Sequence, residues 1–98
     1  MKLVYAPEAV ADLIRLRSFI ADKSPVAAAR IAAELVARIE NLCAFPHLGR
    51  AVRESPQPNV VRDMAFGNYV VRYSEHANAL VVLRIWHHRE DRPPGDVT

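Results

Sequence analysis

The first half of the chain alternates polar and apolar positions in a way that predicts one strand and then a helix. Residues 2–6 form a short apolar run typical of a strand. Pro7 and Glu8 follow, a pair typical of a first helical turn. An apolar stripe then recurs at spacings of three and four residues: Val10, Leu13, Leu16 and Ile20. This pattern predicts an amphipathic helix that ends near Ala21, with Asp12 off its apolar stripe.

A second helix is predicted to start only a few residues later. Ser24 followed by Pro25 is a cap-and-start signal, and Pro46 is expected to close the segment. A second apolar stripe lies between them: Ala28, Ala32, Leu35, Ile39 and Leu42. An exposed charged series of Arg30, Glu34 and Arg38 accompanies it. The short connection predicts a helical hairpin.

The second half of the chain is predicted to form a surface loop and three strands. Residues 46–58 are rich in turn-forming residues, and the runs 59–66, 69–74 and 79–87 are rich in β-branched and aromatic residues. In the last run we expect Val81, Leu83 and Ile85 to face the core. Leu80, Val82, Arg84, Trp86 and His88 are then expected on the opposite face. Residues 90–98 lose the apolar pattern and are expected to form a flexible tail.

This order predicts an α+β fold with two helices packed on one face of a four-stranded sheet. The sheet is expected to combine the N-terminal strand with a three-stranded antiparallel meander. A chain of 98 residues forms one domain, so residues 1–98 are expected to be a single unit. The sequence shows neither a signal peptide nor a membrane span, and the single cysteine, Cys43, excludes an internal disulfide. We therefore expect a cytoplasmic protein.

Arginine and histidine are concentrated in the second half of the chain. The formal net charge is only +2, but residues 46–89 hold six Arg against three acidic residues, and all four His lie after Phe45. Such a basic stretch favours an acidic partner, either nucleic acid or an acidic protein segment. Charge alone does not choose between them.

Four sequence segments in this order resemble the ParE/RelE toxin superfamily of bacterial type II toxin-antitoxin systems. They are VYAPEA at residues 4–9, FPHLGR at 45–50, YVVRY at 69–73 and LRIWHHR at 83–89. The resemblance spans nearly the whole chain and implies a toxin that a cognate antitoxin neutralises in a hetero-oligomeric complex. It implies no metal, no organic cofactor and no membrane, and contact with operator DNA only through the antitoxin.

The resemblance leaves two chemistries open. RelE-like toxins are ribosome-dependent mRNA endoribonucleases, whereas ParE-like toxins trap DNA gyrase on broken DNA without catalysis of their own. Metal-free RNA cleavage needs a base, an acid and a cation for the phosphate. Alignment with the RelE branch places Ala65 where that branch has a phosphate-binding Arg and Gly95 near its catalytic Tyr. A nuclease would therefore need a rearranged site, for which Arg84, His87 and Arg89 are the candidates.

A larger set of residues is a candidate surface for the target or the antitoxin. Planar guanidinium groups suit carboxylate or phosphate, and exposed Arg and Trp are common at binding hot spots. The candidates are Arg50, Arg53, Arg62, Arg72, Arg84, Trp86 and His88. Each could equally be an ordinary surface or packing residue. His87 and His88 cannot chelate one metal ion together, because neighbouring strand residues point to opposite faces.

Three hypotheses follow from the sequence. The first is a ParE-like gyrase inhibitor held by a ParD-like antitoxin, which predicts filamentation and a DNA-damage response on expression without antitoxin. The second is a RelE-like endoribonuclease that cuts ribosome-bound mRNA. The third is a degenerate toxin that only binds its antitoxin, which predicts no growth arrest. The ParE-like branch is the nearest resemblance.

Overall fold

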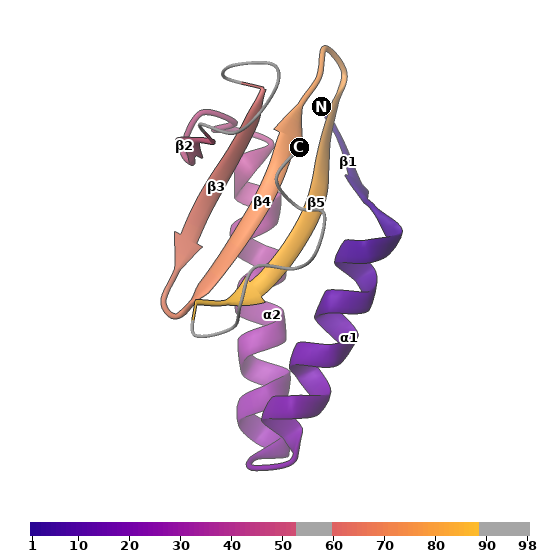
Figure 1. The fold of residues 1–98 in the computed structure, drawn as a ribbon, viewed down its shortest axis with the longest axis vertical. Helices are drawn as coiled ribbons and strands as arrows, with labels where there is room; N and C mark the ends of the chain where they lie inside the picture. The colour runs from indigo at the N-terminus through magenta and orange to yellow at the C-terminus, as the bar shows by residue number, and fades with distance from the viewer. Residues whose placement is uncertain (53–59, 89–98) are drawn as a thin grey trace.

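The computed structural model describes residues 1–52 and 60–88. The elements follow in the order β1 (Lys2–Tyr5), α1 (Pro7–Ala21), α2 (Pro25–Leu42), β2 (Arg50–Ala51), β3 (Val61–Phe66), β4 (Tyr69–Glu75) and β5 (Ala79–His87). Both helices lie on one face of a single sheet (Figure 1). The predicted α+β class and helical hairpin are confirmed. Arg53, Arg89 and the predicted tail at residues 90–98 lie outside the described residues.

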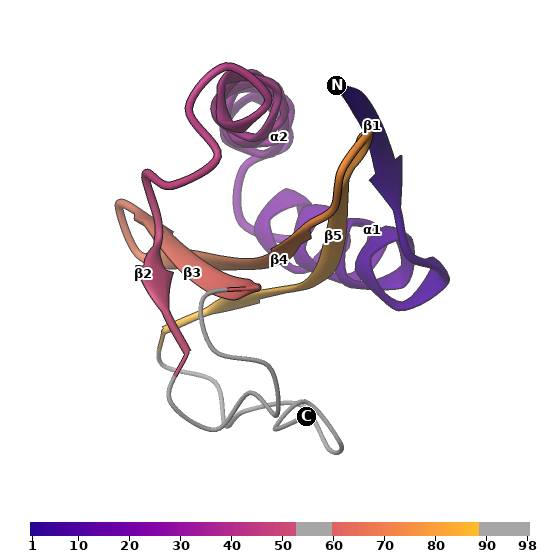
Figure 2. The same ribbon diagram turned by 90° about the horizontal axis from the view of Figure 1, so that it is seen from above.

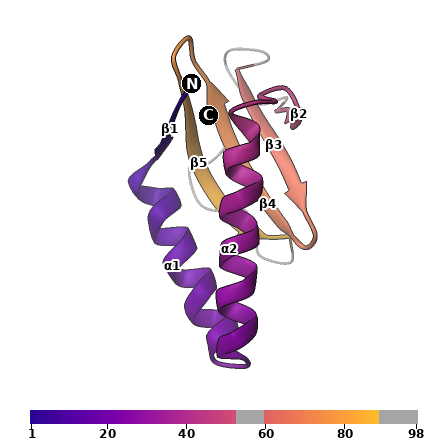
Figure 3. The ribbon, with the colours of Figure 1, turned by 180° about the vertical axis from the view of Figure 1, so that it is seen from behind.

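The helical hairpin forms where local signals predict it. Pro7 opens α1, and the Ser24 hydroxyl caps α2 by accepting a hydrogen bond from the Ala27 amide at 3.2 Å. The two helices run side by side and extend beyond the end of the sheet (Figure 3). Within the described residues, neither helix is long and apolar enough to cross a membrane.

Among the described residues, the sheet has five strands, one more than predicted, in the order β1-β5-β4-β3-β2. The additional strand is β2, in which Arg50 pairs with Asp63 and Ala51 pairs with Arg62. It lies within the stretch predicted as a loop. The sequence did not indicate this strand, because two residues are too few to produce a periodic pattern. β1 runs parallel to β5, and the other pairs are antiparallel. Figure 2 shows the helices on one side of this twisted sheet.

A β-bulge in β5 decides which of its side chains enter the core. Tyr73 of β4 pairs with Val82, but the neighbouring Arg72 pairs with Arg84, so Leu83 is an extra residue. Leu80 and Val82 are fully buried before the bulge and Ile85 after it. The prediction for Ile85 is confirmed. The prediction for Val81 and Leu83 is wrong, because the extra residue reverses the alternation assumed from the sequence.

The two helices differ in how well their apolar stripes predict burial. In α2, the buried residues Ala28, Leu35, Ile39 and Leu42 match the predicted stripe. In α1, the buried residues are Ala9, Asp12 and Leu16, while Val10 is 43% exposed. α1 is therefore rotated so that a carboxylate, and not Val10, faces the sheet.

Candidate functional site

A buried tyrosine fixes the turn that leads from α2 into the sheet. The Tyr73 hydroxyl donates a hydrogen bond to the Pro46 carbonyl at 2.7 Å and accepts one from the Gly49 amide at 2.9 Å. Arg62 Nη1 donates to the Gly49 carbonyl at 3.0 Å. A Cβ atom at Gly49 would lie 2.7 Å from the Tyr73 hydroxyl oxygen, so this close approach requires glycine. The turn thereby places Arg50 beside β3.

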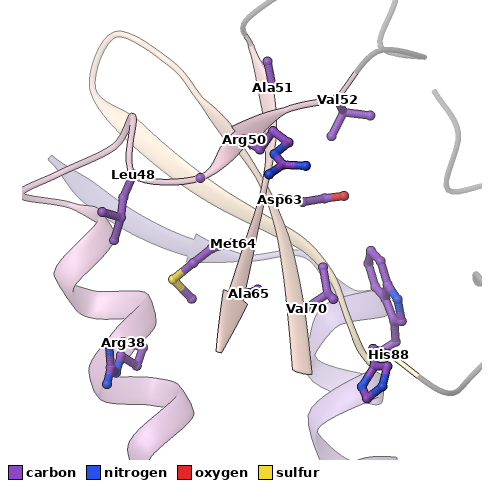
Figure 4. Close-up of a pocket in the computed structure, with 12 residues that line it drawn as sticks. Arg38, Leu48, Arg50, Ala51, Val52, Asp63, Met64, Ala65, Val70 and His88 are labelled. Carbon is purple, nitrogen blue, oxygen red and sulfur yellow. The ribbon is translucent and has the colours of Figure 1, made fainter. Parts of the chain in front are cut away.

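A groove of about 880 Å³ lies along the β3 edge where β2 ends. α2, the turn after it, β2, β3 and the end of β5 all contribute to its walls (Figure 4). We call it the β3 groove, and its walls include Arg38, Leu48, Arg50, Ala65, Trp86 and His88. Arg38, Arg50 and His88 are exposed there, and Leu48 is 59% exposed. The surface therefore combines positive charge with accessible apolar area.

A buried ion pair between Arg72 and Asp63 lies beside the groove, on the sheet face opposite the helices. Arg72 is 1% exposed, and its Nε and Nη2 atoms donate to the two carboxylate oxygens of Asp63 at 2.8 and 2.9 Å. The Arg72 guanidinium carbon also lies 5.2 Å from the centre of the Trp86 ring. This bidentate pair holds Trp86 and β3 in place, and it neutralises the acidic side chain in the groove wall.

The nuclease candidates are held by contacts within the fold. Arg84 donates to Asp12 through Nε at 2.9 Å and through Nη2 at 3.1 Å. The His87 ring meets the Tyr69 ring edge-on, with centroids 5.2 Å apart, and stacks on His88 at 5.0 Å. Arg89 lies outside the described residues. Arg84 therefore points to α1, while His87 packs beside β4.

The candidate binding residues divide into two groups. Arg50, Trp86 and His88 meet in the wall of the β3 groove. Arg62, Arg72 and Arg84 instead bond to the Gly49 carbonyl, Asp63 and Asp12 and hold the fold together. Arg53 lies outside the described residues.

Two groove residues escaped the sequence analysis. Arg38 is exposed, as the predicted solvent-facing series requires, and its guanidinium carbon also lies 4.9 Å from the centre of the Phe66 ring beside the groove. Leu48 lies in the FPHLGR segment and could have been noted there as a large apolar residue in an otherwise polar loop.

A metal site would need several His, Cys, Asp or Glu side chains close together in the described part of the chain. No group of three or more His, Cys, Asp or Glu side chains lies close enough there to hold a metal ion. His47 Nε2 lies within hydrogen-bond distance of Glu75 Oε1, at 2.8 Å.

Comparison with known proteins identifies the family of this chain. Residues 3–92 match the family model described as ParE toxin of type II toxin-antitoxin system, parDE. The chain belongs to the ParE toxin family. The resemblance inferred from the four sequence segments is thereby confirmed, and this ParE family member is a toxin of a type II toxin-antitoxin system.

Relatives of this ParE chain carry RelE names. It is 34% identical over 86 residues to Toxin RelE3 of Caulobacter vibrioides, covering 88% of this chain and 92% of the relative. It is 35% identical over 83 residues to Toxin RelE1 of the same organism, covering 83% and 86%. The fold is similar to a solved structure of a chromosomal ParDE toxin-antitoxin system from P. aeruginosa, with a TM-score of 0.71 and 21% identity over 89% of this chain and 95% of that chain.

Proposed function

We propose that this ParE chain inhibits DNA gyrase by docking to it, and that a ParD-like antitoxin keeps the chain inactive by binding it. The family assignment supports the toxin function. The names of the family model and of the relatives differ, and ParE-like and RelE-like toxins differ in target. The choice of gyrase over ribosome-bound mRNA as the target therefore depends on the residues of the chain itself.

The observation that carries this choice is the contact between Arg84 and Asp12. RNA cleavage needs a cation that is free to meet the developing phosphate charge. The Arg84 guanidinium already faces the Asp12 carboxylate through two hydrogen bonds. His87, the candidate base, is packed against the Tyr69 ring. These contacts favour a structural role for both residues and support a toxin that acts by binding.

The β3 groove supports the docking part of the proposal. Arg38 and Arg50 provide exposed positive groups, and Leu48 provides exposed apolar surface beside them. Interfaces between proteins commonly combine apolar anchors with Arg and aromatic side chains. The groove is accordingly a better match to a macromolecular surface than to a small substrate.

Expression in cells tests the proposal. Induction without antitoxin is expected to produce filamentous cells and an SOS-type DNA-damage response, and co-expression of the antitoxin is expected to abolish both. Growth without arrest would contradict the proposal and support a degenerate toxin that only binds its antitoxin.

The RelE names of the relatives favour a second candidate function. In this alternative the chain is a ribosome-dependent endoribonuclease that uses Arg84, His87 and Arg89. Primer extension on ribosome-bound mRNA distinguishes the two functions. Cleavage that appears on induction and disappears in an Arg84→Ala variant that remains folded would support the nuclease.

A further inference from the structure

The FPHLGR segment, residues 45–50, connects α2 to β2, and its backbone is clamped by side chains of the sheet. The Tyr73 side chain is fully buried, and its hydroxyl donates to the Pro46 carbonyl at 2.7 Å and accepts from the Gly49 amide at 2.9 Å. Arg62 donates from Nη1 to the Gly49 carbonyl at 3.0 Å. These three hydrogen bonds fix the middle of the segment.

Two further contacts anchor the segment closer to its ends. Arg50 is the first residue of β2, and it pairs with Asp63 of β3. His47 Nε2 lies 2.8 Å from Glu75 Oε1 at the end of β4. The conformation of the segment is therefore set by the fold of the toxin itself.

Three large side chains of the same segment are nevertheless exposed. Phe45 is 60% exposed, Leu48 is 59% exposed, and the Arg50 side chain is also exposed. Figure 4 shows Leu48 and Arg50 in the wall of the β3 groove. Exposed apolar side chains beside a cation are typical of a surface that binds another protein.

We propose that the FPHLGR segment is a preorganised recognition element for gyrase, in which Leu48 and Arg50 contact the target and Tyr73 is a positioning residue. This inference rests on the proposed function, because gyrase is the partner. Leu48 requires an apolar pocket on gyrase, and Arg50 requires a carboxylate at the rim of that pocket. A segment that is already ordered loses little conformational freedom when it binds, so the affinity increases.

The contact residues are tested with intact gyrase, supercoiled plasmid and ATP. The measured quantity is the toxin concentration that gives half-maximal linear plasmid. Leu48→Ala and Arg50→Gln alter exposed side chains, and each is expected to raise this concentration about tenfold, the effect of one lost contact in a binding hot spot. Arg17→Gln, at an exposed position on α1, is the matched control and is expected to act like the unmodified toxin.

The positioning role is tested by two variants that leave Leu48 and Arg50 in place. Tyr73→Phe removes the hydroxyl, and Arg62→Gln removes the contact to the Gly49 carbonyl. Each is expected to raise the half-maximal concentration about tenfold, because the segment must then be ordered on binding. Thermal melts show whether each variant is folded at the assay temperature, and Arg62→Gln tests the role if Tyr73→Phe unfolds.

A double variant separates positioning from a general loss of stability. If Tyr73 acts through Leu48, Leu48→Ala should raise the half-maximal concentration by clearly less than tenfold in the Tyr73→Phe background. Independent roles would instead multiply to about a hundredfold. Ile85→Val shortens a fully buried side chain of β5 and is the stability control, expected to act like the unmodified toxin while it remains folded.

Four results would overturn the inference or its premise in distinguishable ways. Unchanged activity of Leu48→Ala and Arg50→Gln contradicts the recognition element and leaves gyrase as the target. Unchanged activity of folded Tyr73→Phe and Arg62→Gln contradicts the positioning role. Absence of linear plasmid with the unmodified toxin contradicts the proposed function itself. A plasmid mobility shift without gyrase that Arg50→Gln abolishes and Leu48→Ala does not would assign the segment to DNA.

Discussion

Asp12 of α1 and Arg84 of β5 form a buried ion pair that joins the helical hairpin to the edge of the sheet. Arg84 Nε lies 2.9 Å from Asp12 Oδ2, and the same oxygen accepts a hydrogen bond from the Ile85 amide at 2.9 Å. β1 has ended by this point, since its last ladder contact is the Ala6 amide to the Val82 carbonyl. The Asp12 carboxylate therefore takes the place of a strand along β5.

We predict that Asp12→Asn lowers the free energy of unfolding by about 3 kcal/mol, because it removes one member of a buried hydrogen-bonded pair. Asp12 is 3% exposed, and the Arg84 guanidinium would lose its charge partner. Urea denaturation measures the change. Asp22→Asn, at an exposed position after α1, is the control and is expected to change stability by less than about 0.5 kcal/mol. Equal stability of the two variants would contradict the assigned role of Asp12.

The same carboxylate predicts a dependence of stability on pH. Burial raises the pKa of Asp12, but hydrogen bonds from Arg84, the Ile85 amide and Arg15 outweigh burial and hold the pKa below its ordinary value of 3.8. A carboxyl with a lower pKa when folded stabilises the fold above its unfolded pKa, and this contribution is lost as the pH falls through the folded pKa. We expect the stability difference between wild type and Asp12→Asn to shrink as the pH falls below 3.8. A stability difference between the two proteins that stays constant through this acid range would contradict the lowered pKa of Asp12.

Tyr73→Phe is predicted to destabilise the turn before β2. It removes the donor to the Pro46 carbonyl and the acceptor of the Gly49 amide. The expected cost is about 1–3 kcal/mol, because a buried amide loses its partner. Tyr5→Phe is the matched control, since the Tyr5 hydroxyl is buried and has no hydrogen-bond partner among the described residues. Differential scanning calorimetry should show a lower melting temperature for Tyr73→Phe only.

Gly49→Ala tests the close approach of the same turn to the sheet. The new Cβ would lie 2.7 Å from the Tyr73 hydroxyl oxygen and 2.8 Å from the Asp63 carbonyl oxygen. We expect a loss of about 1–3 kcal/mol from this overpacking. Because the Asp63 carbonyl belongs to the backbone, Tyr73→Phe should not rescue the variant. Full recovery in the double variant would show that the hydroxyl alone sets the constraint.

Much of the fold could be predicted because its signals are local. Pro7 and the Ser24 cap mark the starts of α1 and α2, and β-branched runs mark β3, β4 and β5. The bulge at Leu83 could not be predicted, because it appears only in the pairing of β5 with β4. The burial of Asp12 likewise depends on Arg84 and Ile85, which are more than 70 residues away in the sequence.

The candidate site could be predicted only in part. Arg50, Trp86 and His88 are recognisable as candidates by residue type, and the structure brings them together in the β3 groove. Arg38 belongs to the groove only because α2 passes beside β3, which no periodicity reveals. Arg72 and Arg84 are arginines like Arg50, so residue type alone could not separate them from it. In the structure Arg72 binds Asp63 and Arg84 binds Asp12, so both stabilise the fold.

The most direct test of the proposed function is a DNA-cleavage assay with purified gyrase, supercoiled plasmid, ATP and the purified toxin. Denaturation and protease treatment then release any DNA that the toxin has trapped in a cleaved complex with gyrase. We predict that linear plasmid accumulates with toxin concentration and disappears when the antitoxin is added first. Unimpaired supercoiling at excess toxin, together with cleavage of ribosome-bound mRNA by the same preparation, would contradict it.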